Sequence, residues 1–167
     1  VDYFVIGENR WHKDTEWPPK CAVEKNLYLS SRDGASADGG GALTFDRPVA
    51  AGEDHYVYDP DDPTPFLIDV SENECLVPEN YKDVELRDDV LVYTTEPLKE
   101  AITIAGEPVA ILYAASSAKD TDWVVRITDL DQAGNSIRMC DGIVRAKFRK
   151  SFIEPKLLLP GEIVRYE

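Results

Sequence analysis

The most pronounced hydrophobic pattern in the chain lies between Val109 and Leu130. Residues 109–114 are apolar on both faces, whereas residues 123–130 alternate between apolar and polar side chains. A continuous apolar run predicts a strand that is covered on both faces, and alternation predicts a strand with one buried face. Small and polar residues at 116–121 predict the connection between them. We therefore expect two strands here, with 109–114 in the middle of a sheet.

Shorter stretches along the rest of the chain repeat these two patterns. They are rich in β-branched and aromatic residues and are bounded by turn-forming residues. About ten strands at short spacing, with no helix and no repeat of fixed period, predict an all-β sandwich or barrel. The further expected strands are 1–6, 26–30, 42–45, 55–58, 90–95, 101–105, 136–140, 143–149 and 164–166, with turns at 131–135, 141–142 and 160–161.

Three stretches follow neither pattern and are expected to be loops. Residues 8–24 contain two adjacent prolines together with Trp11 and Trp17, which predicts an irregular, extended path. Residues 31–41 are rich in glycine, serine and aspartate and predict a mobile loop. Residues 59–88 are acidic, contain four prolines and show no steady period, so we expect a long irregular excursion. Loops of that length are usually functional or packed against something else.

The composition is that of an ordinary globular domain. A hydrophobic content of 43% is enough for a core, and 167 residues fit a single domain spanning 1–167. The formal net charge of −14 repels phosphate, which argues against nucleic acids and anionic membranes as partners. No apolar run is long enough to span a bilayer. Strand patterns at both ends of the chain indicate a piece of a longer protein.

The cysteines indicate the cellular compartment rather than a metal site. Cys21, Cys75 and Cys140 are far apart, and none belongs to a Cys-x-x-Cys motif. Scattered cysteines of this kind are typical of buried free thiols in a reducing compartment, and a single disulfide among them stays open. Together with the lack of a signal peptide, this favours the cytoplasm, although a signal would lie upstream of Val1.

The chain lacks the residue patterns that serine hydrolysis and zinc binding require. A nucleophile elbow requires Gly-x-Ser-x-Gly, and the nearest string, 34–38, lacks the second glycine. The chain has only two histidines, His12 and His55, and no nearby residues give them zinc-ligand spacing. We therefore expect no Ser-His-Asp triad within the chain and assign no catalytic residue.

Calcium is a further alternative. Asp129, Asp131 and Gly134 have the spacing that opens an EF-hand loop, but Ala133 occupies the third ligand position. Cys140 stands where the closing glutamate belongs, and the segment is predicted to be a β-hairpin. We therefore expect no metal and no cofactor.

The three tryptophans divide into two groups. Trp123 lies in an alternating strand, which predicts a core position. Trp11 and Trp17 lie in an expected loop, so they are the candidates for contact with something outside the domain. Three interpretations stay open for that pair: contact with a neighbouring domain, stacking against a sugar, and simple capping of one end of the sandwich.

An ordered series of short strings covers nearly the whole chain. The strings occupy residues 3–11, 17–19, 27–29, 56–63, 87–98, 114–122 and 141–146. Any one string is weak, but their order along the chain is specific. The series resembles the C-terminal domain of the X-Pro dipeptidyl-peptidase and cocaine esterase family of serine hydrolases (the CocE/NonD group).

The resemblance implies a jelly-roll β-sandwich of galactose-binding-like shape, which agrees with the all-β pattern. In this family the catalytic serine, aspartate and histidine belong to a preceding α/β-hydrolase domain, so no catalytic residue carries over to this chain. The implied role is non-catalytic: the domain packs on the catalytic domain of the same polypeptide, which hydrolyses esters, amides or X-Pro peptides, and shapes its active-site entrance. Segments 8–24 and 59–88 are the expected contacts, with Trp11 and Trp17 as anchors.

Two further expectations accompany the resemblance. The family domain continues with strands beyond the position of Glu167, so we expect this sandwich to be incomplete there. An unpaired sheet edge invites strand addition, which predicts self-association of the chain. The alternative function, from a different class, is a free-standing β-sandwich that binds a carbohydrate or another ligand.

Overall fold

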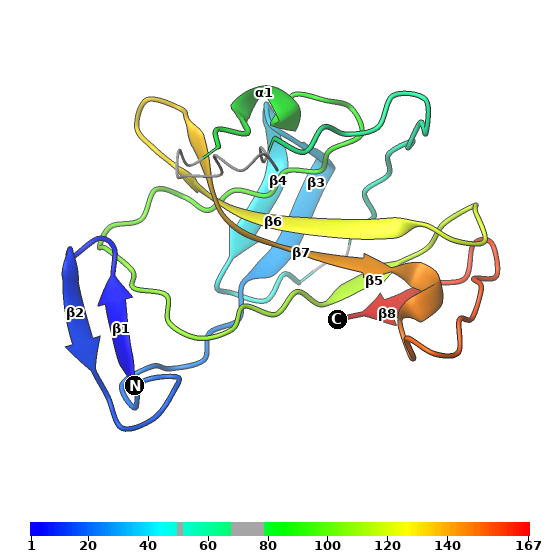
Figure 1. Ribbon diagram of the computed structural model, residues 1–167. Helices are drawn as coiled ribbons and strands as arrows, with labels where there is room; N and C mark the ends of the chain where they lie inside the picture. The colour runs from blue at the N-terminus through cyan, green and yellow to red at the C-terminus, as the bar shows by residue number, and fades with distance from the viewer. Residues whose placement is uncertain (50–51, 68–78) are drawn as a thin grey trace. The chain divides into compact units, whose positions relative to one another are not determined.

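The computed structural model describes residues 1–49, 52–67 and 79–167 and consists almost wholly of antiparallel strand pairs (Figure 1). This confirms the all-β prediction. Two short helical segments, α1 and a 3-10 turn, complete the described elements. Their bounds are β1 (Asp2–Val5), β2 (Arg10–Lys13), β3 (Tyr28–Ser36), β4 (Gly39–Thr44), α1 (Lys82–Glu85), β5 (Leu112–Ala114), β6 (Asp122–Leu130), β7 (Ser136–Arg145), the 3-10 turn (Ala146–Phe148) and β8 (Val164–Tyr166).

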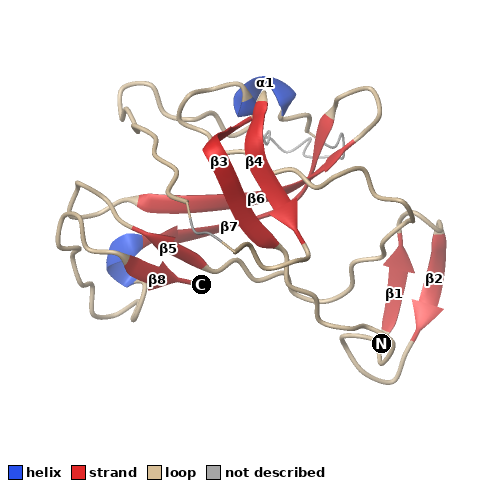
Figure 2. Ribbon diagram, turned by 180° about the vertical axis from the view of Figure 1, so that it is seen from behind, coloured by secondary structure: helices blue, strands red, loops and turns tan. Residues whose placement is uncertain are grey.

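The strands form four antiparallel pairs, β1–β2, β3–β4, β5–β8 and β6–β7 (Figure 2). The jelly-roll arrangement and the single domain therefore stay predictions. The chain divides into two compact units, unit 1 with residues 1–66 and 83–107 and unit 2 with residues 67–82 and 108–167. In the described ranges no helix is long and apolar enough to cross a membrane.

Unit 2 contains the main buried cluster. Trp123 and Tyr166 pack there with ring centroids 5.7 Å apart, which confirms the core position predicted for Trp123 from the alternation of β6. Ala146, in the 3-10 turn, is fully buried within this cluster. The cluster consists of Ala146, Leu158 and Tyr166, with Leu112, Ala114, Trp123, Val144 and Val164 packed against it.

The opposite face of the β6–β7 pair carries a half-buried charged cluster. Arg126 and Asp141 are cross-strand partners, and Arg126 Nε donates to Asp141 Oδ1 at 2.7 Å. Arg138 donates to both oxygens of the same carboxylate and also lies 3.4 Å from Glu79. The Arg126 guanidinium lies 3.5 Å above the centre of the fully buried Tyr81 ring, a cation–π contact. The cluster thus joins the strands to the segment that precedes α1.

The predicted central strand at 109–114 is wrong in two respects. Only the second half of this segment, β5, is a strand, and among the described residues β5 pairs with β8 alone. Val109, Ile111 and Tyr113 are 61%, 50% and 72% exposed, so one face is uncovered. An apolar run indicates which side chains avoid water, but it does not identify the neighbouring segment that would cover them.

The predicted mobile loop at 31–41 is also wrong, because β3 and β4 run through most of it. The glycines of β4 allow another segment to approach the strand. Leu43 N–H donates to the Thr94 carbonyl at 3.0 Å, and Thr94 N–H donates to the Gly41 carbonyl at 3.3 Å. A Cβ added to Gly41 would lie 1.9 Å from the Val92 carbonyl oxygen. The glycine content therefore serves close backbone packing, which composition does not distinguish from flexibility.

Several other predicted strands and turns also differ from the observed elements. The predicted turn at 141–142 is wrong, since β7 continues through both residues in register with β6. Residues 55–58, 90–95 and 101–105 form no strand, and of these Thr94 makes only an isolated bridge to Ala42. Alternation identifies a segment that suits a sheet, but a strand also needs a neighbouring ladder. The turn at 131–135 and the strand at 164–166 are confirmed.

Candidate domain-contact surface

The β1–β2 hairpin of unit 1 positions the residues predicted to contact another domain. β1 and β2 are in register from Asp2 opposite Lys13 to Val5 opposite Arg10. A tight turn joins them, in which Asn9 N–H donates to the Ile6 carbonyl at 3.1 Å. Asn9 has a φ of 52°, in the left-handed region that asparagine tolerates better than most residues. This hairpin replaces the first part of the loop predicted at 8–24.

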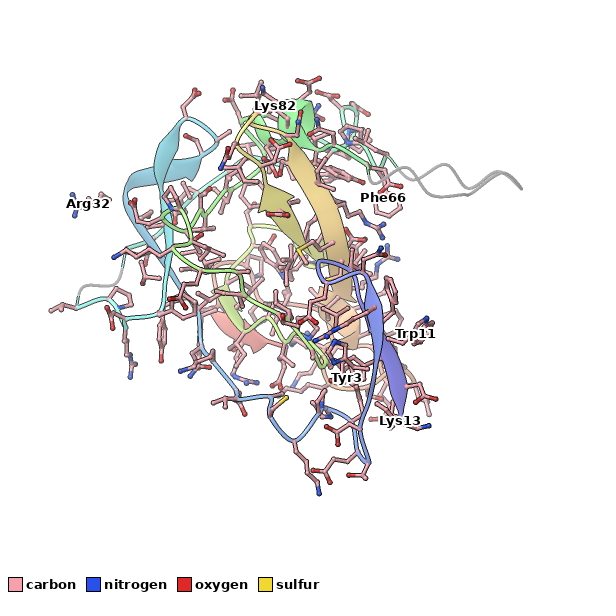
Figure 3. All side chains as sticks on the ribbon, turned by 90° about the vertical axis from the view of Figure 1, so that its left-hand side faces the viewer. Tyr3, Trp11, Lys13, Arg32, Phe66 and Lys82 are labelled. Atoms are coloured by element: carbon pink, nitrogen blue, oxygen red, sulfur yellow. The ribbon has the colours of Figure 1, made fainter. Side chains whose placement is uncertain are left out.

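Trp11 therefore lies on a strand and not on irregular backbone. It faces Phe4 across the hairpin, and the two rings meet edge to face with centroids 5.6 Å apart. Phe4 and Trp11 are 42% and 70% exposed, and Ile6 at the turn is 86% exposed. We refer to Phe4, Ile6 and Trp11 as the hairpin patch. Figure 3 shows the Trp11 side chain projecting from the hairpin.

The other face of the hairpin carries a second aromatic group. Tyr3 lies opposite His12, and their rings stack with centroids 5.5 Å apart. Trp17 packs edge-on against Tyr3 at 5.4 Å and remains 49% exposed. Because Tyr3 and Phe4 are successive residues of a strand, their side chains point to opposite faces. The structure thus places Trp11 on the hairpin and Trp17 against Tyr3 on its other face, in separate aromatic groups.

Asp14 fixes the segment that presents Trp17. Its carboxylate accepts hydrogen bonds from the Thr15 N–H at 2.6 Å and from the Lys20 N–H at 3.3 Å. These backbone donors, the Thr15 amide foremost, hold the pKa of Asp14 below its ordinary value. Pro19 is buried within the same segment. Trp17 is therefore held by a closed turn although no regular element contains it.

A charged group borders the aromatic residues. Glu8 accepts hydrogen bonds from His12 at 2.9 Å and from Arg10 Nε at 2.7 Å. The bond from His12 is the main cause that holds the pKa of Glu8 below its ordinary value. All three side chains lie at or near the surface of the hairpin. An exposed apolar patch with a polar border is the usual composition of a protein contact surface.

The residues considered for catalysis come near one another without forming a triad. Ser36, Asp38 and His55 line one hollow of about 250 Å³ in unit 1. Ser36 Oγ, however, donates to the Gly39 carbonyl at 3.0 Å, and His55 pairs with Glu53 at 3.6 Å. A triad requires hydrogen bonds from serine to histidine and from histidine to the acid, whereas here Ser36 and His55 contact other partners.

The aspartate considered as a calcium ligand closes a turn instead. The Asp131 carboxylate accepts the N–H groups of Ala133 and Asn135 at 2.8 Å each and thereby closes the β6–β7 turn. Within the described ranges no group of three or more His, Cys, Asp or Glu side chains is placed to hold a metal ion. Cys21 is a free, exposed thiol and Cys140 a free, half-buried one, so burial was wrongly predicted for Cys21. Cys75 lies outside the described residues.

Known proteins match this chain over nearly its whole length. Residues 1–167 match the family described as X-Pro dipeptidyl-peptidase C-terminal non-catalytic domain. Cocaine esterase from Rhodococcus sp. (strain MB1 Bresler) is 36% identical over 166 residues, which is 98% of this chain and 29% of the esterase.

Two solved structures share the fold. An aminopeptidase from a marine sediment Thaumarchaeota archaeon superimposes with a TM-score of 0.79 at 32% identity, covering 99% of this chain and 28% of that one. An α-amino acid ester hydrolase gives a TM-score of 0.79 at 30% identity, covering 99% and 29%. The chain thus spans less than a third of the length of these relatives. The resemblance inferred from the ordered strings is confirmed, and the chain belongs to the family of X-Pro dipeptidyl-peptidase C-terminal non-catalytic domains.

Proposed function

We propose that this chain packs on the catalytic portion of the same, longer polypeptide and shapes the entrance to a serine hydrolase active site. The similar proteins are named as an esterase, an ester hydrolase and an aminopeptidase, and in each the matched region is less than a third of the whole. Their common chemistry is cleavage of an ester or amide. The longer protein would accordingly transfer an acyl group to a serine that the catalytic portion supplies.

The hairpin patch is the observation that carries this proposal. Large aromatic side chains at 42% and 70% exposure cost free energy in water unless a partner covers them. Covering the exposed part of Trp11 removes about 140 Å² from water, which contributes about 3.5 kcal/mol at 25 cal/mol/Å². Tryptophan is also the residue type most enriched at the energetic centres of protein interfaces. We therefore assign Trp11 as the main anchor and Trp17 as a second contact.

The test compares two exposed aromatic residues in the longer protein. Trp11→Ala should lower its unfolding temperature by several degrees and raise KM for a bulky ester, because the docked domain loosens at the entrance. The kcat for a small ester should change little, since the nucleophile is untouched. Phe152→Ala is the matched control: Phe152 is 90% exposed but belongs to unit 2, whereas the hairpin belongs to unit 1.

Equal behaviour of the two variants would contradict this assignment. A second measurement separates docking from folding: in the 167-residue chain alone, Trp11→Ala should change stability much less than in the longer protein. The alternative function makes the opposite prediction. Clear affinity of the chain for a glycan, lost in both Trp11→Ala and Trp17→Ala, would favour a carbohydrate-binding module.

A further inference from the structure

The acidic charge of the chain is concentrated in unit 1. Unit 1 contains 20 acidic and 8 basic residues, which gives it a formal net charge of −12. Unit 2 contains 12 acidic and 10 basic residues, so its formal net charge is only −2. A surface with a large excess of one sign of charge raises the local concentration of small ions of the opposite sign. Unit 1 is therefore the main source of negative potential in this chain.

The partners of the carboxylates also differ between the two units. In unit 2, Arg145 pairs with Asp122 at 2.7 Å and Lys147 pairs with Asp120 at 3.2 Å, so opposite charges cancel locally. In unit 1, the carboxylate of Asp14 accepts backbone N–H groups instead, and these hold its pKa below the ordinary value without adding a positive charge. The carboxylate of Asp14 thus stays ionised, and its charge acts on the surroundings.

Two further carboxylates border Trp17 in unit 1. Glu16 precedes Trp17 in the chain and is exposed. Gly106 packs against Pro18, since a Cβ added to Gly106 would lie 3.2 Å from the Pro18 Cγ. The exposed Glu107, which follows Gly106, therefore borders the same segment. A half-exposed indole ring with carboxylates beside it favours a cation over an uncharged group, because the ring face attracts cations as well.

The β1–β2 hairpin and Trp17 belong to unit 1, and they are the residues that we assign to the active-site entrance. The inference therefore rests on the proposed function: a substrate that approaches the entrance passes the carboxylates of unit 1. We propose that unit 1 attracts positively charged substrates towards the entrance, so that the longer protein favours esters or amides that carry a cationic group. Attraction of this kind raises the rate of encounter and weakens as salt screens the charges.

The experiment measures kcat/KM of the longer protein for two esters of the same shape but different charge. Acetylthiocholine is the cationic ester, and 3,3-dimethylbutyl thioacetate is its uncharged isostere. At low ionic strength kcat/KM should be higher for the cationic ester, and this advantage should shrink as salt is added, because salt screens only the charged substrate from the field. A kcat/KM for acetylthiocholine that does not exceed that of the isostere, or an advantage that salt leaves unchanged, would overturn the inference.

Paired glutamine variants test whether unit 1 is the source of the attraction. The double variant Glu16→Gln, Glu107→Gln should lower the advantage of the cationic ester about fourfold at low ionic strength, since each unit charge about 10 Å away in water contributes about twofold. Glu154→Gln, Glu162→Gln is the matched control, because both residues are exposed, belong to unit 2 and change the total charge equally. Equal effects of the two double variants would contradict the assignment to unit 1.

Fluorescence quenching measures the potential at Trp17 in the 167-residue chain alone. In a Trp11→Phe background Trp17 is the exposed tryptophan, because Trp123 packs in the core. Glu16→Gln, Glu107→Gln should weaken quenching by Cs⁺ and strengthen quenching by iodide. Quenching by uncharged acrylamide should not change, which shows that the exposure of Trp17 is preserved. Unchanged quenching by both ions would overturn the inference.

The outcomes separate this inference from the proposed function. Equal behaviour of Trp11→Ala and Phe152→Ala in the longer protein would contradict docking through the hairpin. If those two variants differ as expected but the cationic ester has no advantage, the electrostatic inference alone is wrong.

Discussion

Asp141 is the carboxylate that two arginines of the β6–β7 pair share, and its replacement measures how much the charged cluster stabilises the fold. Asp141→Ala removes the acceptor of the hydrogen bonds from Arg126 and Arg138. Both guanidiniums would then remain close together without their common counter-ion. The cluster also includes Tyr81 beneath Arg126, so the segment before α1 should loosen as well.

The expected magnitude follows from exposure. The side chains of Asp141, Arg126 and Arg138 are 14%, 16% and 26% exposed. Breaking a fully buried ion pair costs about 3–5 kcal/mol, whereas an exposed pair contributes at most about 1 kcal/mol. We therefore expect Asp141→Ala to lower the free energy of unfolding by about 2 kcal/mol. For a chain of this size that corresponds to a fall in Tm of about 4–8 °C.

Thermal and urea unfolding of the purified chain give both quantities, with a control on the same two strands. Asp122 pairs with Arg145 through two bonds of 2.7 Å, but these side chains are 34% and 53% exposed. Asp122→Ala should therefore cause a clearly smaller loss, because solvent screens the pair. Equal losses, or a loss below about 0.5 kcal/mol for Asp141→Ala, would refute the reasoning that burial sets the strength of these pairs.

Two further outcomes are expected. Burial raises the pKa of Asp141, but hydrogen bonds from Arg138 and Arg126 outweigh it, so the pKa lies below its ordinary value of 3.8. The stability that this group contributes is complete above pH 3.8 and is lost as pH falls through the lower pKa of the folded state. Thermal melts should therefore show the difference in unfolding temperature between wild type and Asp141→Ala narrowing below pH 3.8. A difference that stays constant with pH would contradict this. Gly41→Ala should destabilise the chain by about 1–3 kcal/mol, since the new Cβ would meet the Val92 carbonyl oxygen at 1.9 Å. Gly142→Ala is the control and should be neutral or slightly stabilising in urea unfolding, because a Cβ at Gly142 meets nothing within 4 Å. Equal effects of the two substitutions would count against the close approach at Gly41.

Local patterns along the chain predicted the strands whose partners are near in sequence. The alternation at 123–130 correctly identified β6 and the inward direction of Trp123, and the turn-forming residues at 131–135 correctly located its hairpin. These features depend on residues within one hairpin, so period and turn chemistry suffice. The family could also be predicted from the sequence, because the resemblance rests on short strings that occur in a fixed order along the chain.

The sequence by itself determined which segments avoid water and which suit an extended backbone. It did not determine what lies next to them. That Leu112 would pair with Tyr166 depended on a contact between segments distant in the chain. The same holds for Trp11 and Trp17, which form separate aromatic groups because Phe4 and Tyr3 alternate across a hairpin. Side-chain chemistry is local, but pairing partners are chosen by long-range packing, and only the tertiary structure records that choice.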